Sequence, residues 1–531
     1  MASQGPERDG NDAGHLLNKP SSSETQPLLD PRTSTASHHS GESATKQLTA
    51  RHAFAVLVTL QIGSGIFASP SQVDSNVPSP GAALLVWALG GLLSWAGAAS
   101  FAESGAAIPL NGGMQAYLAY VYGDTMAFLM AWIYIMAAKP AAMAIQSIVI
   151  AESIGSISSS PTAAWVLKLV AALTFVAMVL VNSINTRVTI RLSESFTGIK
   201  LMTVFLVVIA GLVAVIAHLV NPKSSLSGGE DWHSKNWFST RPTFYEGHTI
   251  DWTSMSTWDR YGHYSAAIYG GLWAFDGWDN ANVVASEIRN PGQALPKAIK
   301  AAMIVVLGSY ELVNLAYYIL LPWSTVSSSD AVAVVALGSA FGRWAGILMS
   351  ILVAVSCAGS ITSNVFVVGR LTVAASERQY LPAILGERGL PWRQSQATIQ
   401  CDDPGIDSQA NGIAVQNQDK LSRFDAPIWA NVLALVLTLV YILTGSFRTL
   451  LTFAGMAMWV FYISTVLGLL ILRRREPALH RPYKPAVTLP AIFVVSGTFI
   501  LLRSAIFAPV QAGVLACLLI IGTSISKLRT R

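Results

Sequence analysis

The sequence predicts an all-α integral membrane protein, and three observations support this prediction. Hydrophobic residues make up 52% of the 531 residues and charged residues only 12%, about half the charged fraction of an ordinary soluble protein. The mean hydropathy is +0.48. Apolar stretches of about 20 residues, the length that crosses a bilayer as a helix, recur along the chain. A soluble protein of this size needs a more polar surface than these residues can supply.

The composition also argues against several other classes of protein. The three cysteines, Cys357, Cys401 and Cys517, are too few and too scattered for a disulfide-stapled secreted protein. No phosphate-binding loop of the Gly-x-x-x-x-Gly-Lys-Ser/Thr type is present, which disfavours a primary pump. The spans lack the cluster of His, Cys or acidic residues that a membrane-embedded enzyme needs. We therefore expect no enzyme, no metal site and no cofactor.

The chain divides into a tail, a membrane domain and a short end. Residues 1–50 are rich in Ser, Thr, Gly, Pro and Asp without an apolar run, so a disordered cytoplasmic tail is expected. Residues 51–526 form the membrane domain, and residues 527–531 a short cytoplasmic C-terminus. Twelve spans are expected within the membrane domain, at 53–73, 81–103, 125–152, 162–182, 195–219, 263–287, 298–321, 340–371, 426–445, 448–472, 487–505 and 509–526.

The basic residues predict the orientation of these spans. With twelve spans, most of the 34 Lys and Arg residues fall on the side of the N-terminal tail, including Arg187, Arg191 and the block 473–475. Short loops rich in Lys and Arg stay in the cytoplasm, so both termini are expected there. The net charge of +5 is thus mainly a topology signal, and no nucleic-acid partner is expected. The loop at 220–262 lies outside, and the loop at 376–425, with a polar insertion at 394–420, lies inside.

Two spans contain residues that a simple anchor helix avoids. Gly63, Ser64 and Gly65 interrupt the first span, while Gly270–Gly271 and Asp276 interrupt the sixth. Each glycine costs a helix about 1 kcal/mol relative to alanine, and a carboxylate near the bilayer centre costs about 2.5–3.5 kcal/mol. Such residues persist where the backbone lines a polar cavity. Close helix packing is the alternative explanation for the glycines, but it does not account for Asp276.

The spacing of the two breaks predicts a transporter site. The sixth span follows the first by five helices, so a five-helix unit repeated once arrives in the membrane inverted. Broken helices at matching places in inverted halves are the best sequence pointer to a transporter site. The N-terminus of a half-helix attracts an anion, and the C-terminal carbonyls of the other attract a cation. An α-amino acid carries one group of each kind.

Residues 61–70 and 269–279 resemble the first-helix and sixth-helix signatures of the L-type amino acid transporter family, within the amino acid–polyamine–organocation superfamily. The resemblance covers about 51–484, and Asn111–Gly112 is typical of its fungal, methionine-permease-like branch. Shorter matches lie at 101–103, 108–113, 139–140, 287–291 and 314–318. The resemblance implies a LeuT-like fold of twelve helices, with a 5+5 inverted repeat plus two. It also implies a secondary active transporter of L-amino acids, working as an exchanger or a proton-coupled symporter by alternating access. A non-transporting sensor sharing the fold is the alternative.

The resemblance also implies roles for individual residues. The N–H groups of Ser64 and Gly65, together with Ile66, would hold the substrate carboxylate. Trp273 would close over the substrate as the inner gate, with a packed core tryptophan as the alternative, whereas Trp278 is expected to be packing. The carbonyls implied to accept from the substrate ammonium are those of Gln61, Trp273 and Ala274.

Three charged residues lie within the expected spans. Two of them, Asp276 and Lys200, each have two interpretations, and Lys139 has one. In one interpretation, Asp276 lets the site accept amino acids with cationic side chains in addition to neutral ones such as methionine and leucine. In the other, Asp276 caps a helix or is protonated. The resemblance implies that Lys200 stands where sodium-coupled relatives in the superfamily bind a cation. It is either a permanent tie between the first, fifth and eighth helices or a group that titrates and allows proton coupling. Lys139 is expected to be structural.

The expected partners are few. The loop at 153–162 has no cysteine, so no disulfide-linked heavy subunit is expected. Residues 12–17 and 24–29 both fit an acidic dileucine sorting pattern, so sorting adaptors on the tail are plausible partners. The plasma membrane is the expected location, with a vacuolar or endosomal membrane as the alternative.

Overall fold

The computed structural model describes the membrane domain in segments: residues 49–108, 112–157, 162–184, 186–224, 226, 228–245, 248–280, 282, 288, 290–387, 389 and 426–529, without the side chains of His52, Val56 and 184–194. The expected tail with its dileucine patterns and the insertion at 394–420 lie outside the described residues. So do Glu287 and Arg289 of the segment that follows the sixth span.

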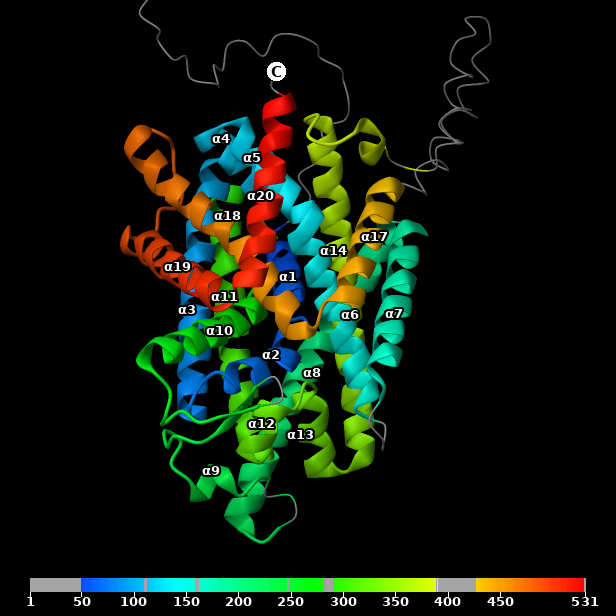
Figure 1. Ribbon diagram of the computed structural model, residues 1–531, viewed down its shortest axis with the longest axis vertical. Helices are drawn as coiled ribbons and strands as arrows, with labels where there is room; N and C mark the ends of the chain where they lie inside the picture. The colour runs from blue at the N-terminus through cyan, green and yellow to red at the C-terminus, as the bar shows by residue number, and fades with distance from the viewer. Residues whose placement is uncertain are drawn as a thin grey trace, which may run out of the picture. The chain divides into compact units, whose positions relative to one another are not determined.

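Helices form most of the described chain (Figure 1). In order they are α1 (Ala50–Gln61), α2 (Gly65–Asp74), α3 (Pro80–Ala107), α4 (Met114–Tyr122), α5 (Asp124–Ile133), the π-helical η1 (Tyr134–Ala138), α6 (Lys139–Gly155), α7 (Ala164–Ile184), α8 (Thr186–Val220), α9 (Asp231–Ser234), α10 (Thr257–Ala274), α11 (Pro291–Leu320), α12 (Trp323–Ser328), α13 (Val332–Phe341), α14 (Arg343–Glu377), the 3₁₀ turn η3 (Ala383–Gly386), α17 (Ile428–Thr444), α18 (Phe447–Arg475), α19 (Thr488–Phe507) and α20 (Pro509–Arg529).

Many of these helices suit a bilayer. Within the described residues nine are long and apolar enough to cross it, or ten if the bent pair α1 and α2 counts as one span. α13 and α17 are shorter apolar helices, and α10 stands where the sixth span was expected. The expectation of a helical, multi-pass protein is confirmed, while the total of twelve spans stays a prediction.

The helices differ in how deeply they are buried. The apolar window of the α5–η1–α6 span is 83% buried within the protein, whereas those of α7 and α20 are 17% buried. Leucines such as Leu173 and Leu180 on α7 are therefore exposed, and in a bilayer they face lipid. The long third span thus runs through the centre of the domain, where it can contribute to a site.

Both expected breaks are present, but Gly270 and Gly271, which were expected to interrupt the sixth span, lie within helix α10. Gly270 instead serves close packing, since a Cβ there would lie 3.1 Å from the Cγ of Gln72. α1 ends at Gln61 and α2 begins at Gly65, with a bend of 44° between them. α10 ends at Ala274, and a run of turns follows in which Gly277 has φ +110°. A side chain is strained at this φ, which explains a glycine three residues past the helix end. α2 packs against α10, and α1 packs against α11, so the two breaks meet inside the domain.

The loop before α10 holds structure that the sequence did not predict. Strands β1 (Thr243–Tyr245) and β2 (His248–Ile250) pair antiparallel, with Thr243 opposite Ile250. The Thr243 hydroxyl donates to the Ser75 carbonyl at 3.0 Å and accepts from the Trp252 indole at 2.9 Å. The hairpin is thereby attached to the residue just past the end of α2.

A buried ion pair lies beside this hairpin. One Arg241 nitrogen donates to both oxygens of Asp74, at 2.5 and 2.7 Å. The Tyr318 hydroxyl donates to the same carboxylate at 2.5 Å, and Arg241 also donates to the Trp323 carbonyl at 2.8 Å. The Asp74 side chain is fully buried. This Asp74–Arg241 cluster joins the loop to the ends of α2 and α11.

Candidate functional site

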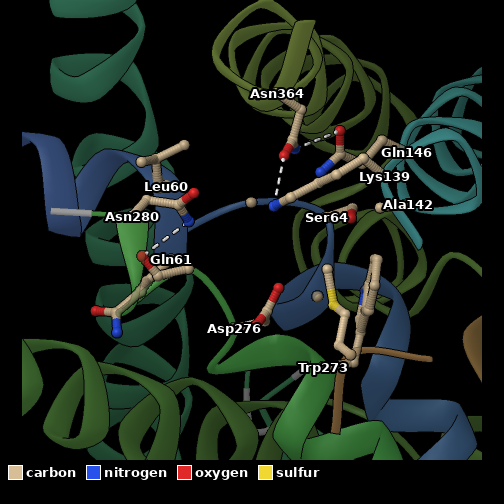
Figure 2. A pocket seen from close by; sticks show the side chains of 14 residues that line it. Leu60, Gln61, Ser64, Lys139, Ala142, Gln146, Trp273, Asp276, Asn280 and Asn364 are labelled. Carbon is tan, nitrogen blue, oxygen red and sulfur yellow. Dashed lines mark hydrogen bonds between the residues drawn. The ribbon is translucent and has the colours of Figure 1, made fainter. Parts of the chain in front are cut away.

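The two helix breaks border one pocket, shown in Figure 2. Its remaining walls come from α6, α14 and α18, so five parts of the fold converge on it. The residues that line it are Leu60, Gln61, Gly63, Ser64, Gly65, Lys139, Ala142, Gln146, Trp273, Asp276, Gly277, Asn280, Asn364 and Met458. All of the expected substrate-binding residues line the pocket except Ile66 and Ala274. These two are buried, and each directly follows a lining residue in the sequence. Lys200 is also outside the lining.

The start of α2 offers free backbone donors to the pocket. Phe67 and Ala68 both donate to the Ser64 carbonyl, at 3.1 and 3.0 Å. Among the described residues, the N–H groups that precede them, at Ser64, Gly65 and Ile66, make no hydrogen bond to the carbonyls at the end of α1, because the chain bends between the two helices and the first N–H groups of a helix have no partner within it. Together with the helix dipole they make a place for a carboxylate.

Two glycines at this break lie where a larger residue would crowd neighbouring atoms. A Cβ on Gly65 would lie 2.4 Å from the Cα of Ala274, and a Cβ on Gly63 would lie 2.8 Å from the Ser360 hydroxyl. Gly65 therefore allows the backbones of α2 and α10 to touch. This close approach brings the start of one half-helix beside the end of the other.

The carbonyls expected to meet the substrate ammonium are partly engaged. The Tyr310 hydroxyl lies 2.6 Å from the Gln61 carbonyl and 3.0 Å from the Ala274 carbonyl. Tyr310 is fully buried on α11. A carbonyl oxygen accepts two hydrogen bonds, so each keeps one position for another donor. Sequence reasoning missed Tyr310, because only the tertiary packing brings α11 between the two breaks.

The side chain of Gln61 points away from the centre of the pocket (Figure 2). Its amide nitrogen donates to the Met303 sulfur at 3.2 Å and to the Phe275 carbonyl at 3.5 Å. Its amide oxygen is buried without a hydrogen-bond partner among the described residues. The amide group contacts Met303 and Phe275, which do not line the pocket, so this side chain is not placed to meet a substrate there.

Asp276 lies just past the end of α10 and faces the pocket. It is partly buried, and its Oδ1 accepts from the Tyr462 hydroxyl of α18 at 2.7 Å. In Figure 2 its carboxylate points into the pocket beside Trp273. This position suits an acid that contacts the side chain of a substrate. It is equally compatible with the helix-capping interpretation, because Asp276 lies two residues past the end of α10.

Lys139 has a larger part in the pocket than the sequence suggested. It begins α6 directly after the π-helical segment η1 and is 2% exposed. Its Nζ donates to the Asn364 amide oxygen at 3.5 Å, and Asn364 donates to Gln146 at 3.4 Å. Figure 2 shows the amine entering the pocket opposite Asp276. The only sequence signal was a lysine in mid-span, which also fits a structural tie.

Lys200 lies outside the pocket and is fully buried. Its Nζ donates to the Thr59 carbonyl of α1 and to the Ser360 hydroxyl of α14, each at 2.7 Å. Lys200 itself lies on α8, so it joins the first, fifth and eighth expected spans at the broken helix.

Trp273, in the last turn of α10, and Trp278, past its end, differ in environment. Trp273 is partly buried and lines the pocket. Trp278 is 1% exposed and packs against Phe101 and Tyr462, with ring centroids 4.9 and 4.7 Å away. The expectation that Trp278 serves packing is confirmed. The described residues include no group of three His, Cys, Asp or Glu that could hold a metal ion.

The chain is similar to a family of known proteins over most of its length. The family described as "Amino acid permease" matches residues 48–523. The b(0,+)-type amino acid transporter 1 of Homo sapiens is 29% identical over 470 residues, covering 88% of this chain and 84% of that protein. The human cystine/glutamate transporter is 28% identical over 88% of this chain and 82% of its own length. The mouse Asc-type amino acid transporter 1 is 29% identical, with 90% and 80% covered. The resemblance drawn from the sequence motifs is confirmed at the level of the family, and the chain belongs to the amino acid permease family.

Proposed function

We propose that this protein is a secondary active transporter that moves L-amino acids across a membrane by alternating access. The observation that carries the proposal is the pocket between two broken helices. It offers free N–H groups at the start of α2 and carbonyls at the ends of α1 and α10. An α-amino acid has a carboxylate and an ammonium close enough together to use both.

The substrate carboxylate would accept from the N–H groups of Ser64, Gly65 and Ile66. The ammonium would donate to the carbonyls of Gln61, Trp273 and Ala274. The two that Tyr310 already contacts each have a second acceptor position.

The side-chain part of the pocket sets the substrate class. Its lining includes the apolar Ala142, Met458 and Trp273, which suit neutral side chains such as those of methionine and leucine. Asp276 would admit a cationic side chain as well. Trp273 would move over the bound amino acid as the inner gate.

Lys200 would replace a coupling ion. Its two hydrogen bonds tie α1, α8 and α14 together without sodium. A permanently charged Lys200 suits an exchanger, in which return of the empty protein is slow. A Lys200 that releases its proton suits a proton-coupled symporter.

Several further features belong to the same proposal. Twelve spans would be arranged as a 5+5 inverted repeat plus two helices, and the fungal branch remains the expected one. Both termini would lie in the cytoplasm. In support, Arg475 at the end of α18 contacts the Tyr120 carbonyl near the end of α4, and Arg529 near the end of α20 contacts Asp124 at the start of α5. These basic helix ends therefore gather on one side, as the positive-inside rule requires.

The location and partners are also proposed. The plasma membrane is favoured, with the vacuolar or endosomal membrane as the alternative that the dileucine patterns would serve through sorting adaptors. No disulfide-linked heavy subunit would be needed, because the loop at 153–162 has no cysteine.

Uptake into proteoliposomes tests the proposal. The full chain is reconstituted, and uptake of radiolabelled methionine, leucine and arginine is measured with internal amino acid, with a proton gradient, and with neither. Uptake that needs internal amino acid identifies an exchanger, and uptake driven by the gradient identifies a symporter. Binding without uptake of any amino acid would instead support a sensor with the same fold.

Two glycine variants sharpen this test. Gly65→Ala should reduce uptake of every amino acid by at least about a hundredfold, because its Cβ would lie 2.4 Å from the Ala274 Cα and push the two half-helices apart. Gly308→Ala is the matched control, since nothing lies within 4 Å of the Cβ it would add. Full uptake by Gly65→Ala would mean that the contact between the breaks does not shape the site.

A further inference from the structure

We propose that Lys139 determines the charge specificity of the pocket. Its ammonium counters the negative charge of Asp276, so the pocket favours amino acids with uncharged side chains over cationic ones. This inference rests on the proposed transport function and names the substrate class of the same site.

The first argument is placement. Lys139 and Asp276 both line the pocket, and Figure 2 shows them entering it from opposite sides. Within the described residues no ion pair joins them directly. Yet the Lys139 ammonium is near enough to attract the carboxylates of both Asp276 and Asp279. A substrate side chain placed in the pocket therefore experiences both charges.

The second argument is how loosely the Lys139 amine is held. Its hydrogen bond to Asn364 is 3.5 Å long, and its other described contact is the ring of Tyr134, with the centroid 5.6 Å away. Lys200, which is equally buried, has two hydrogen bonds of 2.7 Å to neighbouring helices. A lysine that only tied helices together would resemble Lys200. Lys139 instead keeps donor positions directed at the pocket.

The third argument is electrostatic. A buried ammonium with a long hydrogen bond is stabilised chiefly by nearby negative charge. Asp279 supplies part of that charge, but it lies outside the pocket lining and its Oδ1 accepts from Asn280 at 3.1 Å. Asp276 is thus the carboxylate that faces both Lys139 and a substrate. A cationic side chain near Asp276 must overcome repulsion from Lys139, and repulsion between like charges is strong in a site shielded from water.

The test compares arginine with leucine in the proteoliposome assay. Lys139→Met should raise the ratio of arginine to leucine uptake by at least about tenfold, because the repulsion is removed and Asp276 remains. Adding Asp276→Asn to Lys139→Met should return the ratio to within about threefold of the unmodified protein. Lys139→Arg keeps the charge and should leave the ratio low.

Lys168→Met is the matched control. Lys168 also lies within a span, but its Nζ donates to the Leu443 carbonyl at 2.5 Å, away from the pocket. Its removal should not change the ratio.

The outcomes separate this inference from the function it rests on. If the unmodified protein moves no amino acid, the proposed function fails. If it transports leucine but Lys139→Met leaves the ratio unchanged, only the inference about Lys139 is overturned. Loss of both uptakes in Lys139→Met and in the double variant also overturns it, because Lys139 is then a structural tie.

Discussion

The Asp74–Arg241 cluster and the pocket each place a carboxylate near a basic side chain inside the protein, and they differ in one respect. In the Asp74–Arg241 cluster the charges touch, at 2.5 and 2.7 Å, and Tyr318 adds a third hydrogen bond. In the pocket, Asp276 and Lys139 share a cavity, but each is bonded to a different neighbour. The same types of charge are thus joined in one place and held apart in the other.

This difference teaches what each pair does. Charges in contact satisfy each other, so the Asp74–Arg241 cluster stabilises the packing of the loop on α2 and α11. Charges held apart across a cavity leave hydrogen-bonding capacity for a third molecule. We therefore expect changes at Asp74 to act on stability and changes at Asp276 to act on selectivity.

The largest effect should come from Asp74→Ala. Removing one partner of a buried pair leaves the other uncompensated, at a cost of about 3–5 kcal/mol. The apparent melting temperature of the purified protein in detergent should fall by about 5 °C or more. Asp330→Ala is the control, because Asp330 is 51% exposed and 3.6 Å from Arg448, and such pairs contribute about 1 kcal/mol or less. Equal melting temperatures for the two variants would contradict a stabilising role for the cluster.

Asp276→Gly should act on selectivity. It removes the carboxylate that faces the substrate side chain and leaves Lys139 to repel cations, so arginine uptake should fall by at least about tenfold while leucine uptake is spared. The melting temperature should change less than in Asp74→Ala, because Asp276 faces the cavity. Arginine uptake that survives would show that Asp276 does not read the substrate side chain.

The smallest effects come from the two tyrosines that bond these carboxylates. Tyr318→Phe removes the hydrogen bond to Asp74 and should lower stability by about 1 kcal/mol, seen as a lower melting temperature with an unchanged ratio of arginine to leucine uptake. Tyr462→Phe removes the hydrogen bond to Asp276 and should change that ratio by about threefold with little loss of stability. Both variants keep the aromatic ring, so each is the control for the other. A reversed pattern would contradict the distinction between the two regions.

The parts of the site that the sequence predicts are residues that destabilise a membrane helix whatever their neighbours are. Gly63 and Gly65 weaken a helix wherever they stand, and a carboxylate such as Asp276 is expensive in any span. These penalties can be read without knowing the neighbours. The break at the end of α1 was therefore predicted at the right residues, and the end of α10 was predicted near Asp276, but the expected interruption at Gly270–Gly271 was wrong because α10 runs through both glycines.

Contacts between distant segments were not predicted. Asp74 and Arg241 are 167 positions apart, and Tyr310 is 249 positions from Gln61. Neither pairing has a local signature, since a tyrosine or an arginine is compatible with many surroundings. The β1–β2 hairpin was missed for a similar reason, because a polar loop gains its order by packing on the end of α2.

The sequence by itself determined that this chain is a multi-pass helical membrane protein with two broken helices, because hydropathy and helix propensity act over single turns and spans. Only the tertiary structure decided which groups meet at the breaks. It placed Tyr310 on the carbonyls of Gln61 and Ala274, Lys200 across three helices, and Lys139 in the pocket with Asp276. The physical reason is that a charge or hydroxyl in a span must find its partner through packing, and packing is a property of the whole fold.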